Sequence, residues 1–140
     1  MIVYVESSAL LAWLLREPDA ARVEAIMDAA DVVIASDLTL IECHRAIHRQ
    51  SALGKLSAQS ARLAADLSLE TASWVVLGFT PAIVERASQA FPIEPIRTLD
   101  ALHVAFALRA RSENAAIALL SLDERIRRVG NSLGLDILPA

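Results

Sequence analysis

The sequence is short of cysteine, lysine and aromatic residues, and these shortages narrow the class of protein. Cys43 is the only cysteine, so an intrachain disulfide is excluded and a reducing compartment is expected. No apolar run reaches the roughly 18 to 20 residues that a membrane-spanning helix needs. The N-terminus also lacks the charged, apolar and small-residue sections of a signal peptide. We therefore expect a cytoplasmic protein with no membrane association.

Composition predicts one globular domain with a negative net charge. Apolar residues make up 55% of the chain and aromatic residues 4%, so we expect a core of Ala, Leu, Val and Ile. A chain of 140 residues is long enough for one such core, and we expect a single domain over residues 1–140. The net charge of −4 argues against a broad basic surface for nucleic acid. Local clusters can still contact phosphate, such as Arg125, Arg127 and Arg128.

Strand-like runs alternate with helical patterns along the chain. The strand-like runs are Ile2–Val5, Val32–Ala35, Trp74–Phe79, Ala116–Leu120 and a weaker Leu135–Leu138. The helical patterns are Ala9–Arg16, Asp19–Ala30, Leu38–Gln50, Ala58–Ser73, Pro81–Ala90, Leu99–Arg111 and Glu124–Leu133. This alternation predicts an α/β fold with a mainly parallel central sheet of four to five strands, flanked by helices on both faces. In such sheets, ligands bind outside the carboxyl ends of the strands.

Four acidic residues lie where such a sheet places its binding site. Glu6 directly follows the first strand, and Asp123 follows the fourth strand-like run. Asp100 opens an almost entirely apolar helix, and Glu42 lies in the first turns of the helix after the second strand. If the four segments converge, their carboxylates line one cleft, and such hard oxygen ligands suit Mg²⁺ or Mn²⁺. A metal held in this way can activate water and stabilise charge on a phosphodiester.

Helix capping offers a structural alternative for two of these acids. Ser121 and Glu124 form an S-x-x-E capping box, in which Asp123 only stabilises a helix N-terminus. Thr39 and Glu42 fit the same pattern. Under this interpretation neither acid has a chemical role.

The other acids have structural alternatives as well. Asp100 would be a first-turn acid behind a Thr98 cap, and Glu6 would be a solvated strand end beside capping serines. Glu42 has a further option, an ion pair with Arg45 three residues later.

The remaining polar residues carry weaker signals. His44 and His48 share a helix face, but no H-E-x-x-H motif or third ligand accompanies them, so we expect ordinary surface residues or residues that support a neighbouring site without binding a ligand. His103 follows Asp100 by three residues, and we expect it either to hydrogen-bond an acid or to pack in the core. Cys43 is expected to be a small core residue.

Four segments of the chain resemble the signature segments of PIN domains, and in particular the VapC-type toxins of toxin–antitoxin pairs. They are "VYVESSALLAWLL", "SDLTLIECHRAIHR", "IRTLDALHVAFALRA" and "LLSLDERIRRVGNSLGLDIL". Their order and spacing agree with the family over essentially the whole chain. The resemblance implies a three-layer sandwich with a parallel sheet, an acidic pocket that binds Mg²⁺ or Mn²⁺, and endoribonuclease activity on RNA. It also implies homodimerisation and inhibition by a small antitoxin.

The resemblance also assigns roles to individual residues. By motif position, the metal-site acids are Glu6, Glu42, Asp100 and Asp123. Ser7 and Ser121 match the hydroxyl residues that accompany the first and last acids. Glu6 departs from the family, which usually has aspartate there. Its extra methylene moves the carboxylate outward by about 1.5 Å, so we expect Mn²⁺ to support activity better than Mg²⁺, which demands near-ideal geometry.

Two other functions compete with a toxin ribonuclease. The Glu6 departure motivates a catalytically weak PIN domain that serves as an RNA- or antitoxin-binding module. A phosphoacceptor receiver domain also places acids at strand ends. Domains of that family use a lysine after a late strand to contact the phosphoryl group. Lys55, the only lysine, falls in an expected connection between helices, which disfavours that function.

Overall fold

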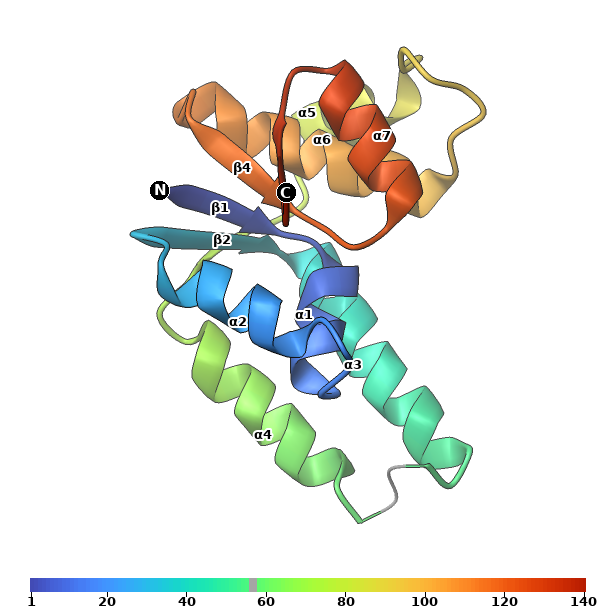
Figure 1. Cartoon of the computed structure of the whole chain (residues 1–140). Helices are drawn as coiled ribbons and strands as arrows, with labels where there is room; N and C mark the ends of the chain where they lie inside the picture. Colours follow the sequence, from blue (N-terminus) through green and yellow to red (C-terminus); the bar gives the residue numbers. More distant parts are fainter. Residues whose placement is uncertain (56–57) are drawn as a thin grey trace.

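A parallel five-stranded sheet forms the centre of the molecule (Figure 1). The computed structural model describes residues 1–55 and 58–140. The strands are β1 (Ile2–Val5), β2 (Val32–Ser36), β3 (Val75–Leu77), β4 (Ile117–Leu120) and β5 (Asp136–Leu138). Their order across the sheet is β3-β2-β1-β4-β5, and every neighbouring pair is parallel. All five predicted strands are confirmed, and β3 is shorter than its apolar run suggested.

Helices cover both faces of the sheet and complete a three-layer sandwich. They are α1 (Ser7–Leu14), α2 (Ala20–Asp28), α3 (Asp37–Ala52), α4 (Ser60–Thr71), α5 (Pro81–Ser88), α6 (Thr98–Glu113) and α7 (Glu124–Ser132). In Figure 1, helices α1 to α4 lie below the sheet, and α5 to α7 lie above it. Each helix matches a predicted pattern to within a few residues. The predicted α/β class is therefore confirmed.

Alternating side chains of the strands divide the core between the two faces. Tyr4 on β1 and Leu119 on β4 pack with α5, α6 and α7, whereas Val3 and Val5 pack with α1 to α4. Successive residues of a strand point to opposite faces, so a strand covered on both sides is apolar throughout. The continuous apolar runs of the sequence are explained by this two-sided burial.

Two of the predicted helix starts are wrong in detail. Ser36 is the N-cap of α3, and its Oγ accepts a hydrogen bond from the Thr39 amide, so Thr39 is not the cap. Arg97 is the N-cap of α6, and Thr98 is already helical. In both cases the helix begins earlier than the sequence pattern suggested, because a strand or loop end supplies the extended capping residue.

Two further features bear on function. Lys55 lies in the connection between α3 and α4, as expected, which removes the basis for a receiver domain. No helix among the described residues is long and apolar enough to cross a membrane.

Candidate metal site at the carboxyl end of the sheet

The four acidic residues singled out in the sequence line one pocket beside the ends of β1 and β4. This acidic pocket has a volume of about 400 Å³, and its lining includes Glu6, Glu42, Asp100 and Asp123. Glu6 directly follows β1, and Asp123 is the residue before α7. Because β1 and β4 are neighbours whose following helices cover opposite faces, the pocket lies at the switch point where open α/β sheets bind ligands. The four segments therefore converge, as a shared cleft requires.

Glu6 is buried, and three serine hydroxyls hold its carboxylate. The residue is 2% exposed. Ser7 Oγ donates to Oε1 at 2.7 Å, Ser121 Oγ donates to Oε2 at 2.8 Å, and Ser8 Oγ also donates to Oε2. Hydrogen bonds to a charged group offset the cost of removing it from water. The interpretation of Glu6 as a solvated strand end is therefore wrong.

Ser8 also connects Glu6 to the loop that carries Asp123. Its Oγ accepts hydrogen bonds from the amides of Leu122 at 2.9 Å and Asp123 at 3.1 Å. Ser121 Oγ accepts from the same Asp123 amide at 3.2 Å, so Ser121 serves this loop and does not cap α7. Sequence reasoning treated Ser8 only as a cap, and the hydroxyl two residues after the first acid was the only signal of this role.

His103 lies between Glu6 and Glu42 and is 1% exposed. Its Nε2 contacts Glu42 Oε1 and lies 3.6 Å from Glu6 Oε1, whereas its buried Nδ1 has no hydrogen-bond partner in the described part of the chain. A proton on Nδ1 would be a buried donor without an acceptor, but a proton on Nε2 faces two carboxylate oxygens. We therefore assign the proton to Nε2, which makes His103 a donor to the acids. This agrees with the expected hydrogen bond to an acid; Glu42 is the partner, and Glu6 lies just beyond hydrogen-bond distance.

A buried chain of hydroxyl groups fixes the helix that carries Glu42. Tyr4 Oη donates to Ser36 Oγ at 2.9 Å, and Thr39 Oγ1 donates to the Val5 carbonyl at 3.2 Å. Burial raises the pKa of Tyr4 far above its usual value, and the hydroxyls around it lower that pKa only in part. The start of α3 is thereby tied to the end of β1. No ion pair joins Glu42 and Arg45 among the described residues, so that alternative is wrong.

Asp100 and Asp123 each have one carboxylate oxygen that accepts hydrogen bonds from groups outside the Glu6–Glu42–His103 cluster. Arg97 Nε donates to Asp100 Oδ2 at 3.2 Å. Asp123 is the N-cap of α7, and its Oδ1 accepts from the amides of Arg125 and Ile126. Within the described ranges, the second oxygen of each aspartate has no hydrogen-bond partner. These oxygens remain available to a ligand in the acidic pocket.

The donor set fits a hard divalent cation. Glu6, Glu42 and His103 bring side-chain polar atoms within 4.8 Å of one another, the one such group of three among the residues that the structure describes. With its proton on Nε2, His103 orients the two carboxylates, and the carboxylate oxygens are the ligands left for the cation. Asp100 and Asp123 line the same pocket without joining that group. Mg²⁺ and Mn²⁺ prefer oxygen ligands, and Mg²⁺ usually keeps several waters, so it need not touch every carboxylate directly.

The other residues considered from the sequence lie outside this group. Cys43 is buried in the core, and burial raises the pKa of its thiol, as expected for a structural cysteine. His44 is half-buried and His48 is exposed. Neither histidine belongs to a group of metal-ligating side chains in residues 1–55 and 58–140.

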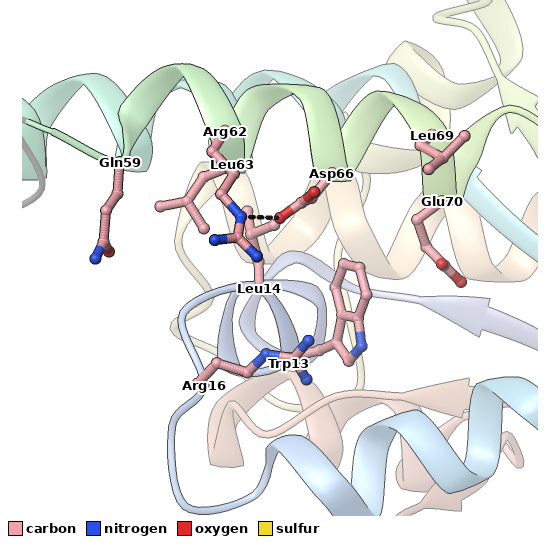
Figure 2. A pocket seen from close by; sticks show the side chains of 9 residues that line it. All are labelled: Trp13, Leu14, Arg16, Gln59, Arg62, Leu63, Asp66, Leu69 and Glu70. Carbon is pink, nitrogen blue, oxygen red and sulfur yellow. Dashed lines mark ion pairs between the residues drawn. The ribbon is translucent and has the colours of Figure 1, made fainter.

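A separate pocket of about 390 Å³ lies between the end of α1 and α4 (Figure 2). Its lining combines apolar side chains such as Trp13 with the charged pair Arg62 and Asp66, whose side chains are 3.9 Å apart. Figure 2 shows this pair on α4, facing Trp13 of α1 and Arg16, which lies just after the end of α1. Its acids are not part of any close group of three metal-ligating side chains among the described residues, so the chemistry points to the acidic pocket.

Solved structures with the same fold include VapC20, VapBC2 and FitAcB. VapC20 of Mycobacterium tuberculosis, a sarcin-ricin loop cleaving toxin, has a TM-score of 0.68 at 19% identity, covering 91% of this chain and 95% of that one. VapBC2 of Rickettsia felis, bound to a promoter DNA fragment, has a TM-score of 0.65 at 14% identity, with 98% and 97% covered. FitAcB of Neisseria gonorrhoeae has a TM-score of 0.59 at 16% identity, with 98% and 96% covered.

A search of curated proteins gives no match. The family profile of the PIN domain matches residues 3–132, a range that includes every acid of the pocket. The resemblance inferred from the four sequence segments is thus confirmed. The chain belongs to the PIN domain family.

Proposed function

We propose that the protein is a metal-dependent endoribonuclease, the toxin of a VapBC-type toxin–antitoxin pair. The observation that carries the proposal is the convergence of Glu6, Glu42, Asp100 and Asp123 on one pocket in a chain of the PIN family. VapC20, a sarcin-ricin loop cleaving toxin, has the same fold and supports the proposed RNA-cleaving activity.

The four acids would hold Mg²⁺ or Mn²⁺, which supplies a Lewis acid and activates water for attack on a phosphodiester. The chain's own residues prepare that site. The serine hydroxyls keep the Glu6 carboxylate fixed, and His103 holds Glu42 beside it through its Nε2 proton. Asp100 and Asp123 each keep one oxygen free. Because these side chains are already positioned, little rearrangement is needed when the cation and RNA bind.

We also propose a small antitoxin partner, a homodimer and a cytoplasmic location. VapBC2, which binds a fragment of its own promoter DNA, and FitAcB share this fold and support the antitoxin partner. The hydrogen bonds of Glu6 favour an alternative function, that of a catalytically weak module that only binds RNA or the antitoxin. Both oxygens of the Glu6 carboxylate already accept hydrogen bonds from serine hydroxyls, which leaves them less available to a metal.

Cleavage of a structured RNA pool by the purified protein tests the proposal. Reactions with Mg²⁺, Mn²⁺ and EDTA are compared for the wild type, for Asp100→Asn, and for Asp136→Asn as a matched control at an exposed acid outside the pocket. We expect metal-dependent cleavage that Asp100→Asn loses and Asp136→Asn keeps. Cleavage that survives in EDTA or in Asp100→Asn would refute the mechanism. Absence of both cleavage and Mn²⁺ binding by calorimetry would favour the binding module.

A further inference from the structure

A second pocket, rich in arginine, opens beside the acidic pocket. This arginine pocket has a volume of about 400 Å³ and is lined by Arg97, Arg125 and Arg128, with apolar side chains that include Ile96 and Val129. Arg97 precedes α6, whereas Arg125 and Arg128 lie three residues apart on α7 and therefore share a helix face. Three cations of one pocket come from two separate elements.

The two pockets are continuous. Arg97 and Asp100 line both of them, and the Arg97–Asp100 ion pair lies at their shared edge. With a divalent cation held by the acids, a strand of RNA with one phosphate at that cation can place neighbouring phosphates on the arginines. Only a ligand with regularly repeated negative charge would use both pockets at once.

Two of the three arginines of the pocket have no ion-pair partner in the described part of the chain. Arg125 and Arg128 are exposed and have no ion-pair partner among the described residues, and the Arg97 side chain is 64% exposed. Arg127 on the same helix is different, because it donates to the carbonyls of Ser121, Leu138 and Pro139 and so has a structural role. Helix α7 therefore carries one arginine with a structural role, Arg127, and two that line the arginine pocket, Arg125 and Arg128.

The lining of the arginine pocket has three arginines and two acids, Glu94 and Asp100, so its net charge is positive. Glu94 uses both carboxylate oxygens to accept the Phe91 and Ile96 amides within its own loop. Asp100 is paired with Arg97. Arg125 and Arg128 thus remain uncompensated in a protein whose net charge is −4. Guanidinium groups bind phosphate through two parallel hydrogen bonds, which suits this position.

We propose that the arginine pocket binds the RNA phosphates that flank the cleaved bond. The proposal rests on the proposed function, since it assumes that RNA is the ligand of the acidic pocket. It assigns Arg125 and Arg128 to RNA binding and leaves the chemistry to the acids. An acidic peptide could satisfy the same arginines, but it has no reason to extend toward four further carboxylates.

The test measures RNA affinity separately from cleavage. Binding of a labelled single-stranded RNA is followed by anisotropy in EDTA over a range of KCl concentrations. The variant is Arg125→Gln/Arg128→Gln, and the control is Arg49→Gln/Arg62→Gln, which removes the same charge from exposed positions on α3 and α4. Losing two phosphate contacts lowers the salt slope of log K by about 1.4, at about 0.7 per contact with a single strand. We expect at least about tenfold weaker binding at low salt for the variant and no change for the control.

A conservative variant separates a binding role from a structural one. Arg125→Lys/Arg128→Lys keeps the charge, so the salt slope should return even where affinity recovers only in part. In metal-supported cleavage, the glutamine variant should raise KM and leave kcat unchanged. An unchanged salt slope, an equal loss in the control, or loss of polyglutamate binding without loss of RNA binding would each overturn the assignment. Arginine-dependent RNA binding without cleavage in any metal would instead refute the nuclease and leave the arginine pocket standing.

Discussion

Replacing Glu6 by aspartate tests whether the hydroxyls of Ser7, Ser8 and Ser121 are positioned to bind the carboxylate of the longer side chain. The substitution removes one methylene and draws the carboxylate back by about 1.5 Å. Hydrogen bonds of 2.7 Å from Ser7 and 2.8 Å from Ser121 would then exceed the limit for such a bond. Each hydrogen bond to a charged group contributes about 1.5–3 kcal/mol, so losing the pair costs roughly 3–6 kcal/mol before relaxation.

Two effects reduce this cost. The serine side chains can follow the carboxylate in part, and aspartate at the N-cap of α1 gains about 1 kcal/mol by accepting amides of the first turn, which Glu6 does not do. We therefore expect Glu6→Asp to lower the free energy of unfolding by about 2 kcal/mol. Glu6→Gln keeps the length of the side chain, and its neighbouring hydroxyls can rotate to accept from the amide, so we expect a loss of about 1 kcal/mol.

Urea unfolding in EDTA, followed by tryptophan fluorescence, measures both free energies without any contribution from metal. The reasoning requires Glu6→Asp to be less stable than Glu6→Gln. An aspartate variant as stable as the wild type would show that the serines do not depend on the glutamate. The common family residue would then fit this site without cost.

Three further predictions concern single residues. Tyr4 is the only tyrosine, and burial raises its pKa. The stability that its neutral form contributes is present below about pH 10 and is lost as the pH rises through the pKa of the folded state. Tyrosinate absorbance should therefore appear only when the protein unfolds in alkali. Burial likewise raises the pKa of Cys43, so Ellman's reagent should leave the native thiol unmodified and titrate one thiol after unfolding. Arg127→Gln loses three hydrogen bonds to carbonyls and should lower the free energy of unfolding by about 2 kcal/mol, whereas Arg128→Gln should leave the melting temperature unchanged.

The fold was predictable because its signals are local and repeated. Each strand buried on both faces is a continuous apolar run, and β1 and β4 match their predicted bounds to within one residue. Helix ends were less predictable, since capping depends on which residue is left extended by the preceding strand. Ser36 and Asp123 take that role because β2 and the loop after β4 end there.

The candidate site was predictable in its acids but less so in its supporting contacts. Strand ends and motif positions selected Glu6 and Asp123 before the structure placed them in one pocket. The bridge from Ser8 to the Leu122 amide joins residues more than a hundred positions apart, and no sequence pattern encodes such a contact. Arg97 was missed for a similar reason, because its importance comes from the two pockets that meet beside it.

The parallel sheet also determines where this protein can be fused to other sequences. Because the strands are parallel, their amino ends all lie on one side of the molecule, where the Met1 amino group pairs with Asp31. Their carboxyl ends lie on the opposite side, which carries the acidic pocket. A purification tag placed before Met1 emerges away from the pocket. A polyhistidine tag placed after Ala140 begins on the side of the acidic pocket, just beyond the carbonyls to which Arg127 donates, where it would compete for divalent metal. Recombinant forms intended for metal or RNA measurements should therefore carry an N-terminal tag.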